Sequence, residues 1–128
     1  MIKLADLIGA PFKAHGRSIK EGFDCYGLAI EVEKRAGRKL NDVFYSRVET
    51  AEQKRVQGIV LGGLNSLEKI DAPEQYCFIV INGMKRPHCA IYLGHDQMIH
   101  ATEDMGVVID RLSRWKFKVD GFYRVEKL

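Results

Sequence analysis

The sequence lacks the patterns that mark several classes of protein. Its three cysteines, Cys25, Cys77 and Cys89, include no Cys-X-X-Cys pair, so neither a disulfide framework nor a zinc site is predicted. The four histidines do not have metalloprotease spacing, and neither a metal nor another cofactor is expected. No apolar run approaches the roughly 20 residues that span a bilayer, which argues against membrane insertion.

Charge and the N-terminal segment exclude two further classes. The 20 basic and 17 acidic residues leave a net charge of +3, and Lys and Arg form no run interleaved with aromatic residues. Nucleic acid is therefore not an expected partner. Residues 1–10 carry Asp6 inside an apolar stretch, with no small-residue cleavage site after it, so we expect synthesis in the cytoplasm without a signal peptide. The 128 residues predict one domain, 1–128, with a real core.

Residues 22–28 predict the start of a helix with a thiol at its first position. Asp24 suits the N-cap, because its carboxylate can accept a bond from an amide of the first turn. From Cys25 to Ala36, apolar residues recur at helical spacing, and a basic last turn and a glycine, Lys34, Arg35 and Gly37, predict the end. A helix N-terminus lowers a thiol pKa, which favours a nucleophile. The alternative at this point is a small buried cysteine that fills core space.

The remaining elements predict an α+β fold. A short helix is expected at residues 2–8, a loop at 12–21, a surface helix at 49–57 and a glycine-rich stretch of ambiguous structure at 58–63. From residue 67 the hydrophobic period changes to two. Strands are expected at residues 67–70, 76–81, 88–93, 98–102, 107–110 and 121–125, with 76–81 central and buried on both faces. N-terminal helices followed by an antiparallel meander are typical of α+β proteins, with the Cys25 helix packed on the sheet.

Two histidines fall on adjacent predicted strands. Alternation places His88 with Ala90 and Tyr92 on one face of its strand. A three-residue loop at residues 94–96 would pair Ala90 with His100 and bring His100 diagonally close to His88 on that face. A loop with an even number of residues would separate them. A core or surface histidine is the alternative for each one.

A cysteine, a histidine and a third polar group form the general nucleophilic triad. We predict Cys25 as nucleophile, His88 as base and His100 as the orienting group, with the amide of Cys25 in an oxyanion hole. Cys77 and Cys89 are expected to lie in the core and to be inert.

Three ordered motifs resemble those of one family. Residues 22–28 (Gly-Phe-Asp-Cys-Tyr-Gly-Leu), 88–94 (His-Cys-Ala-Ile-Tyr-Leu-Gly) and 98–101 (Met-Ile-His-Ala) look like the motifs of the NlpC/P60 cysteine peptidases. The ending, residues 113–115 and 121–124, resembles the members encoded in phage tail-assembly modules. The resemblance implies a papain-like fold and hydrolysis of peptidoglycan stem peptides, typically between D-γ-glutamyl and a diamino acid. It also implies tail proteins as partners and a virion tail that acts at the cell wall.

The resemblance also implies substrate-binding residues, and two of them depart from the family pattern. Asp24 matches a position associated with holding the free amine of the substrate. Phe12 stands where the family usually has a tyrosine that helps the oxyanion or substrate site. Tyr26 stands where the family often has serine, and we expect its side chain to project beside the cleft, near Phe12. The alternatives are a tail assembly protein with little activity and a related amidase or acyltransferase.

Overall fold

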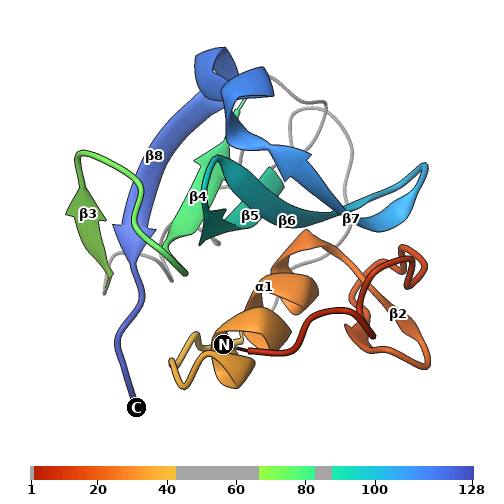
Figure 1. Cartoon of the computed structure of the whole chain (residues 1–128). Coiled ribbons are helices and arrows are strands. Elements are labelled where there is room, and N and C mark those ends of the chain that lie inside the picture. Colours follow the sequence, from red (N-terminus) through yellow and green to blue (C-terminus); the bar gives the residue numbers. More distant parts are fainter. Residues whose placement is uncertain (1, 43–66, 83–87) are drawn as a thin grey trace, which may run out of the picture.

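One α-helix and a six-stranded antiparallel sheet dominate the part of the chain that the structure describes (Figure 1). The computed structural model describes residues 2–42, 67–82 and 88–128. The elements in chain order are β1 (Arg17–Ser18), β2 (Gly22–Phe23), α1 (Cys25–Arg35), β3 (Glu68–Ile70), β4 (Phe78–Ile81), β5 (His88–Gly94), β6 (Gln97–Thr102), β7 (Gly106–Arg111), the short 3₁₀ helices η1 (Leu112–Arg114) and η2 (Lys116–Lys118), and β8 (Val119–Arg124).

The large sheet confirms the predicted fold class and corrects its topology. Its order is β3-β8-β4-β5-β6-β7, and every neighbouring pair is antiparallel. The predicted neighbours β4, β5 and β6 are adjacent, and β4 is buried along its whole length. The sheet is not a simple meander, however, because β8 lies between β3 and β4.

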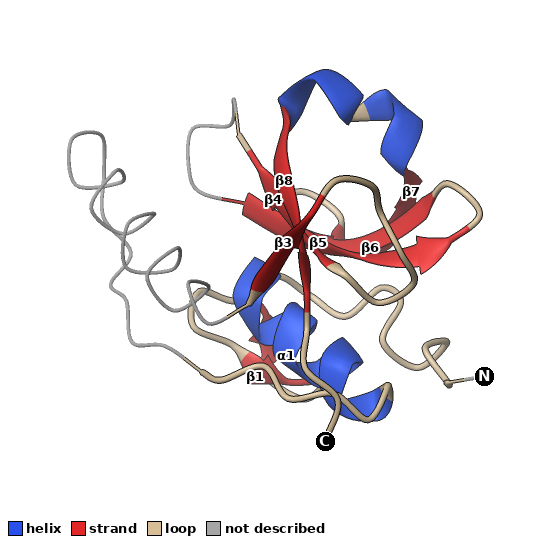
Figure 2. Ribbon diagram, turned by 90° about the vertical axis from the view of Figure 1, so that its left-hand side faces the viewer, coloured by secondary structure: helices blue, strands red, loops and turns tan. Residues whose placement is uncertain are grey.

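The two faces of the sheet carry different layers. Helix α1 covers one face, and η1 and η2 lie on the other (Figures 1 and 2). Alternation along β5 supplies both layers: Cys89 and Ile91 pack with the helix, while Ala90 packs on the opposite side. The helix-side cluster includes Phe23, Leu28, Val32, Phe78 and Ile99, and the opposite cluster includes Ile79, Ile81, Met98 and Leu112.

The β5–β6 hairpin reaches the predicted register by a different turn. Ile91 pairs with Ile99, as the three-residue loop would require, but the turn itself is His95–Asp96 with positive φ at both residues. Two-residue hairpin turns favour that backbone conformation. The register shifts between Tyr92 and Gly94, so a bulge supplies the odd residue that the prediction assigned to the loop.

The N-terminal segment differs from its prediction. Residues 2–8 form no helix; residues 5–9 are turns, closed by the bonds Leu7 N–Leu4 O and Ala10 N–Leu7 O. A single amphipathic turn gains too few hydrogen bonds to continue as a helix. The helix predicted at 49–57 and the glycine-rich stretch at 58–63 lie outside the described residues. No helix of the described part is long and apolar enough to cross a membrane.

Candidate active site

The start of α1 is fixed by its cap and by a glycine. Asp24 has an extended backbone, and its Oδ1 accepts the amide of Gly27 at 2.8 Å. A Cβ on Gly27 would come within 2.0 Å of the carbonyl oxygen of Gly16, so only glycine lets the helix approach that segment. Cys25 is the first helical residue and is half-buried. Its thiol therefore lies at the positive end of the helix dipole.

Asp24 also binds the segment before the helix. Its Oδ1 accepts Arg17 Nη1 at 2.8 Å, and its Oδ2 accepts the amide of His15 at 3.0 Å. The carboxylate is buried, so these charge-assisted bonds compensate its loss of water. Asp24 thus holds the preceding segment against the start of α1, next to the nucleophile. Its predicted part in substrate binding stays a prediction.

The structure brings the two predicted histidines together. His88 Nε2 lies 2.8 Å from His100 Nδ1, and the ring centroids are 5.1 Å apart. His100 is buried in β6, whereas His88 is half-buried at the first residue of β5. Because Nε2 of His88 faces His100, Nδ1 is the ring nitrogen left for the thiol of Cys25, with which His88 forms a hydrogen bond.

The surroundings of Cys25 favour its thiolate. The hydrogen bond from the Cys89 thiol contributes most to lowering the pKa of Cys25. Burial opposes this effect, the hydrogen bond and positive charge of His88 strengthen it, and the charge of Asp24 weakens it. Together these effects hold the pKa of Cys25 well below that of an ordinary thiol, which is the condition for a nucleophilic cysteine.

Cys89 is therefore not the isolated core residue that the sequence predicts. It is buried on the helix side of β5, as expected, but its thiol bonds that of Cys25. Burial raises the pKa of Cys89 well above its usual range, so Cys89 keeps its proton and acts as the donor. Cys77 is buried on the opposite side of the sheet, where burial raises its pKa to about 11.

Replacing Cys89 tests this arrangement. In Cys89→Ala the thiolate of Cys25 loses a donor, and we expect its apparent pKa to rise by roughly one unit or more, since a hydrogen bond to a charged group contributes about 1.5–3 kcal/mol. The measurement is the rate of iodoacetamide alkylation against pH, with Cys25 followed by peptide mass spectrometry. Cys77→Ala is the matched control and should leave the profile unchanged. An unchanged profile in Cys89→Ala would mean that His88 and the helix alone activate Cys25.

Burial determines the protonation state of His100. Burial and the positive charge of His88 lower the pKa of His100 to about 4, against a smaller opposing effect of Asp110. His100 is thus neutral near neutral pH, with one ring nitrogen that donates and one that accepts. A neutral imidazole beside His88 can orient that ring without repelling its positive charge.

Asp110 and Trp115 complete the surroundings of the two imidazoles, and the sequence prediction missed both. Asp110 Oδ2 lies 3.7 Å from His100 Nε2 and accepts Trp115 Nε1 at 3.0 Å. The Trp115 ring lies 5.3 Å from the His100 ring and 6.2 Å from the His88 ring. The signal was available for Asp110, because the antiparallel register of β7 on β6 places it on the face of His100.

Tyr26 corrects a prediction about the substrate cleft. Its side chain is only 2% exposed and packs against Phe78 of β4, with ring centroids 6.0 Å apart. Its hydroxyl donates to the carbonyl oxygen of Asn41 at 2.6 Å, and burial raises its pKa. Tyr26 does not project beside a cleft, because the second position of α1 faces the sheet rather than the end of the helix.

Tyr26 should therefore affect stability. We expect Tyr26→Ser to lower the free energy of unfolding by about 3–4 kcal/mol, the usual cost of removing a buried aromatic ring. Tyr26→Phe keeps the ring, loses one hydrogen bond and should cost about 1 kcal/mol. Urea unfolding of both variants measures the difference. Equal stability of Tyr26→Ser and the unmodified protein would show that the ring does not belong to the core.

Phe12 lies beside the start of α1 as a partly buried residue. It forms an isolated parallel bridge with Phe23, the residue before Asp24, and packs against the helix-side cluster. The structure thus places an aromatic ring, rather than a phenol, in this neighbourhood. Its predicted contact with substrate stays a prediction.

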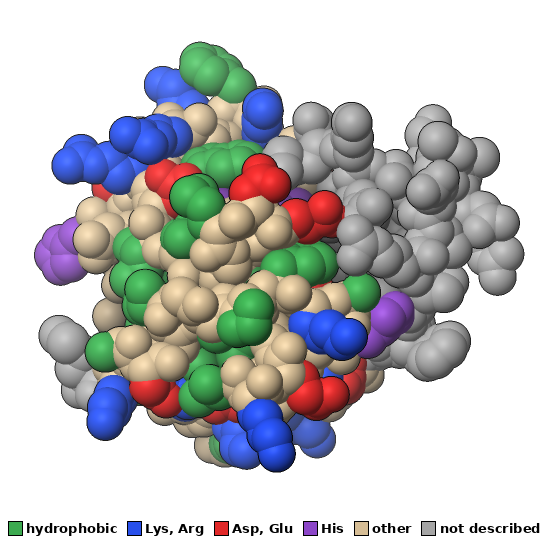
Figure 3. All heavy atoms as spheres, turned by 90° about the vertical axis from the view of Figure 1, so that its right-hand side faces the viewer, with side chains coloured by type: hydrophobic (Ala, Val, Ile, Leu, Met, Phe, Trp, Pro, Cys, Tyr) green, Lys and Arg blue, Asp and Glu red, His purple; other side chains and the backbone are tan. Residues whose placement is uncertain are grey.

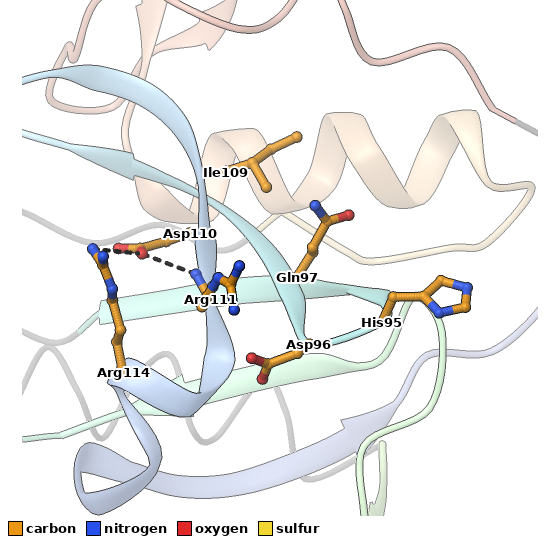
Figure 4. A pocket seen from close by; sticks show the side chains of 7 residues that line it. All are labelled: His95, Asp96, Gln97, Ile109, Asp110, Arg111 and Arg114. Carbon is orange, nitrogen blue, oxygen red and sulfur yellow. Dashed lines mark hydrogen bonds and ion pairs between the residues drawn. The ribbon is translucent and has the colours of Figure 1, made fainter.

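A hollow of about 400 Å³ lies beside the β5–β6 turn, where β6 begins and β7 ends (Figure 4). Its lining residues come from the β5–β6 turn, from the start of β6, from the end of β7 and from η1: His95, Asp96, Gln97, Ile109, Asp110, Arg111 and Arg114. The hollow borders Asp110, whereas Cys25, His88 and His100 are not among its lining residues. Among the described residues no group of three or more His, Cys, Asp or Glu side chains is placed to hold a metal ion.

Basic side chains surround the same region. Lys and Arg side chains lie at the top of the molecule, where η1 and η2 lie, and others lie along its lower edge (Figure 3). Arg114, Lys116 and Lys118 are exposed, and Phe117 between them is 93% exposed. Lys118 Nζ lies 5.8 Å from the centre of the Trp115 ring. The face opposite α1 therefore presents positive charge and an aromatic ring close to the histidine pair.

A thiol at a helix N-terminus that contacts an imidazole of an antiparallel sheet is the papain-like arrangement. The family model of the NlpC/P60 family matches residues 9–124, so the chain belongs to the NlpC/P60 family. None of the curated proteins matches the chain in sequence.

Solved structures share the fold. A protein from Staphylococcus aureus, described as similar to lipoprotein of the NLP/P60 family, is 24% identical with a TM-score of 0.64, over 95% of this chain and 38% of its own. An NlpC/P60 family protein from Bacillus cereus is 22% identical with a TM-score of 0.66, and the match covers 92% of this chain and 36% of the Bacillus protein. The NlpC/p60 domain of the peptidoglycan hydrolase SagA is 22% identical with a TM-score of 0.61, and the match covers 92% of this chain and 89% of that domain. The chain thus spans less than two fifths of the first two proteins.

Proposed function

We propose that this protein is a cysteine peptidase of the bacterial cell wall, with Cys25 as nucleophile, His88 as base and His100 as the group that orients His88. The observation that carries the proposal is the imidazole pair, with His88 Nε2 2.8 Å from His100 Nδ1, beside the helix-start thiol whose pKa His88 helps to lower. A nucleophile beside a base that is held by a third group is the general pattern of covalent catalysis.

The geometry supports acyl transfer in two steps. The thiolate of Cys25 attacks the peptide carbonyl carbon and forms a C–S bond, and the oxygen becomes an oxyanion near the amide of Cys25. The C–N bond then breaks, and the imidazolium of His88 gives its proton to the leaving amine. A water molecule next attacks the thioester carbon while His88 takes its proton. Release of the carboxylic acid breaks the C–S bond and restores the thiolate.

The proposed substrate is a peptidoglycan stem peptide, cleaved between D-γ-glutamyl and a diamino acid. Family membership supports the substrate class, and a structural neighbour is described as a peptidoglycan hydrolase. Asp24 places a carboxylate beside the nucleophile, which suits the free amine of a stem peptide. Since Arg17 already binds that carboxylate, a substrate amine would have to share or displace this partner. Phe12 would give the neighbouring wall an apolar surface.

Digestion of purified muropeptides followed by mass analysis tests the proposal. The expected products are two peptides whose new ends are a D-glutamyl γ-carboxyl group and a free amine. Release of the stem peptide from the lactyl group of the sugar would instead indicate an amidase. Transfer of the acyl group to an added amine would indicate an acyltransferase. Intact muropeptides after incubation would favour a structural protein that keeps the fold without activity.

We also propose a setting for this activity: a phage or prophage tail, from which the protein acts on the cell wall and contacts other tail proteins. Residues 113–115 and 121–124 support this setting through their resemblance to members encoded in tail-assembly modules. Peptide mass spectrometry of purified virions is the test. Virions of an inducible prophage that carries the gene should contain the protein, and its absence from intact particles would contradict the tail setting.

A further inference from the structure

Among the described residues, the buried edge of His100 faces the carboxylate of Asp110. His100 Nε2 is fully buried and makes no hydrogen bond within the described residues. Oδ2 of Asp110 lies 3.7 Å away from it. At that distance the carboxylate acts on Nε2 as an oriented charge rather than through a full hydrogen bond. Burial strengthens such an effect, because the surrounding protein screens the charge less than water does.

The carboxylate of Asp110 is held in place from two sides. Trp115 Nε1 donates to Oδ2 at 3.0 Å, and the amide of Arg111 donates to Oδ1 at 2.9 Å. Arg114 Nη1 lies 3.8 Å from Oδ1, as Figure 4 shows. Both oxygens of Asp110 therefore act as acceptors, which fixes the oxygen that faces His100.

Asp110 keeps its negative charge near neutral pH. Partial burial raises its pKa, but the bonds from Trp115 and Arg111 and the charges of His100 and Arg114 together lower it below the ordinary value. Its side chain is 21% exposed and borders the hollow beside the β5–β6 turn, which gives the charge access to water.

We propose that Asp110 is a positioning residue that acts through His100, and this inference rests on the proposed function. The carboxylate keeps the ring proton of neutral His100 on Nε2. His100 Nδ1 is then an acceptor for the Nε2–H of His88. This leaves Nδ1 of His88 without a proton, so that it can take the proton of Cys25. If the proton of His100 were on Nδ1, His88 would carry its own proton on the side of the thiol and could not act as a base.

The charge also affects the imidazolium of His88. When His88 becomes protonated, Asp110 stabilises the pair of rings through His100. The other charged or titratable groups nearby are Cys25, Cys89 and Asp24 on the thiol side, and Arg114 beside the carboxylate. Lys118 lies over the outer face of Trp115. Arg114 and Lys118 both oppose protonation of His88, the Cys25 thiolate favours it from the thiol side, and Asp110 adds negative charge on the far side of His100.

Asp110→Asn tests the inference in the muropeptide assay, because the amide has the same shape without the charge. We expect kcat to fall about tenfold with KM unchanged, a smaller loss than for an aspartate in direct contact with the base. The alkaline limb of the pH profile should move to lower pH, since the imidazolium loses support. Asp96→Asn is the matched control: Asp96 lines the same hollow and binds Ser113 at the start of η1, but faces neither imidazole.

A second measurement does not need turnover. Long-range ¹H–¹⁵N spectra of the unmodified protein identify the ring tautomer, and we expect His100 with its proton on Nε2 near neutral pH. A proton on Nδ1 of His100 would overturn the inference even if the enzyme cleaves muropeptides. Equal kcat and pH profiles for Asp110→Asn and Asp96→Asn would also overturn it, because both variants would then act only through η1. Absence of cleavage by the unmodified protein with His100 in the expected tautomer would contradict the proposed function instead.

Discussion

Cys25→Ala is expected to abolish muropeptide cleavage, with a loss of at least about a thousandfold relative to the unmodified protein. Alanine cannot form the acyl–sulfur bond, and the remaining groups can only bind substrate. The small side chain leaves the helix cap at Asp24 intact, so thermal unfolding should change little. The measurement is product formation by mass spectrometry over a long incubation, with equal folded protein in each reaction.

Cys77→Ala is the control for this variant, because Cys77 is a buried thiol on the opposite side of the sheet. It should retain full activity. Undiminished cleavage by Cys25→Ala would remove the peptidase proposal altogether. Loss of cleavage in both variants would point to damage of the fold rather than to chemistry.

Glu33→Gln is expected to stabilise the protein at alkaline pH. Glu33 is 0% exposed in α1, and neither carboxylate oxygen has a hydrogen-bond partner among the described residues. Burial raises the pKa of Glu33 to about 8, against a smaller opposing effect of the Arg38 charge. Below that pH the residue is neutral in the folded protein. Above it, an isolated charge is buried, which is costly.

The sign of the pH dependence follows from this raised pKa. The folded protein holds the Glu33 proton more tightly than the unfolded chain, so stability is fully present below the unfolded value and is lost as pH rises toward about 8. The loss corresponds to roughly 5 kcal/mol of unfolding free energy. Glutamine has the same shape and no charge, so the variant should be more stable by roughly that amount at about pH 9 and similar at about pH 5.

Urea unfolding at both pH values measures this effect. Glu31→Gln is the control on the same helix, because Glu31 is paired with Arg35 at 2.9 Å rather than isolated. The control should show no gain at alkaline pH. Equal alkaline stability of Glu33→Gln and the unmodified protein would mean that the carboxylate finds water or a partner when it ionises.

The parts of the fold that could be predicted are those encoded by residues close together in the sequence. The N-cap, the apolar stripe and the final glycine of α1 are encoded within a few residues, and the helix ends at Arg35 as expected. The buried run of β4 and the alternation in β5 similarly fixed which faces meet the core. The position of β8 between β3 and β4 could not be predicted, since pairing over such a distance depends on the whole sheet.

The site was predictable where the alternation of side chains along paired strands determines which residues share a face. His88 and His100 share a face because β5 and β6 are antiparallel with a definite register. Tyr26 was misplaced because helical position alone does not show where the sheet lies. Burial alone predicts that Cys89 is inert, but its neighbour across the helix–sheet interface is Cys25. Contacts between a helix and a sheet require three-dimensional packing, which spacing along one chain does not contain.

The place of β8 has a consequence for synthesis. β3 and β4 leave the ribosome before β8, and until β8 is made each of them has an unpaired edge. The unpaired edge of β4 belongs to a wholly apolar strand, Phe78–Ile81. Such edges are sites where nascent chains associate wrongly. Contacts between residues as far apart as Glu68 and Arg124 also form slowly. A chain that ends before residue 119 therefore has a sheet that is divided in its interior, between β3 and β4, rather than one shortened at its edge.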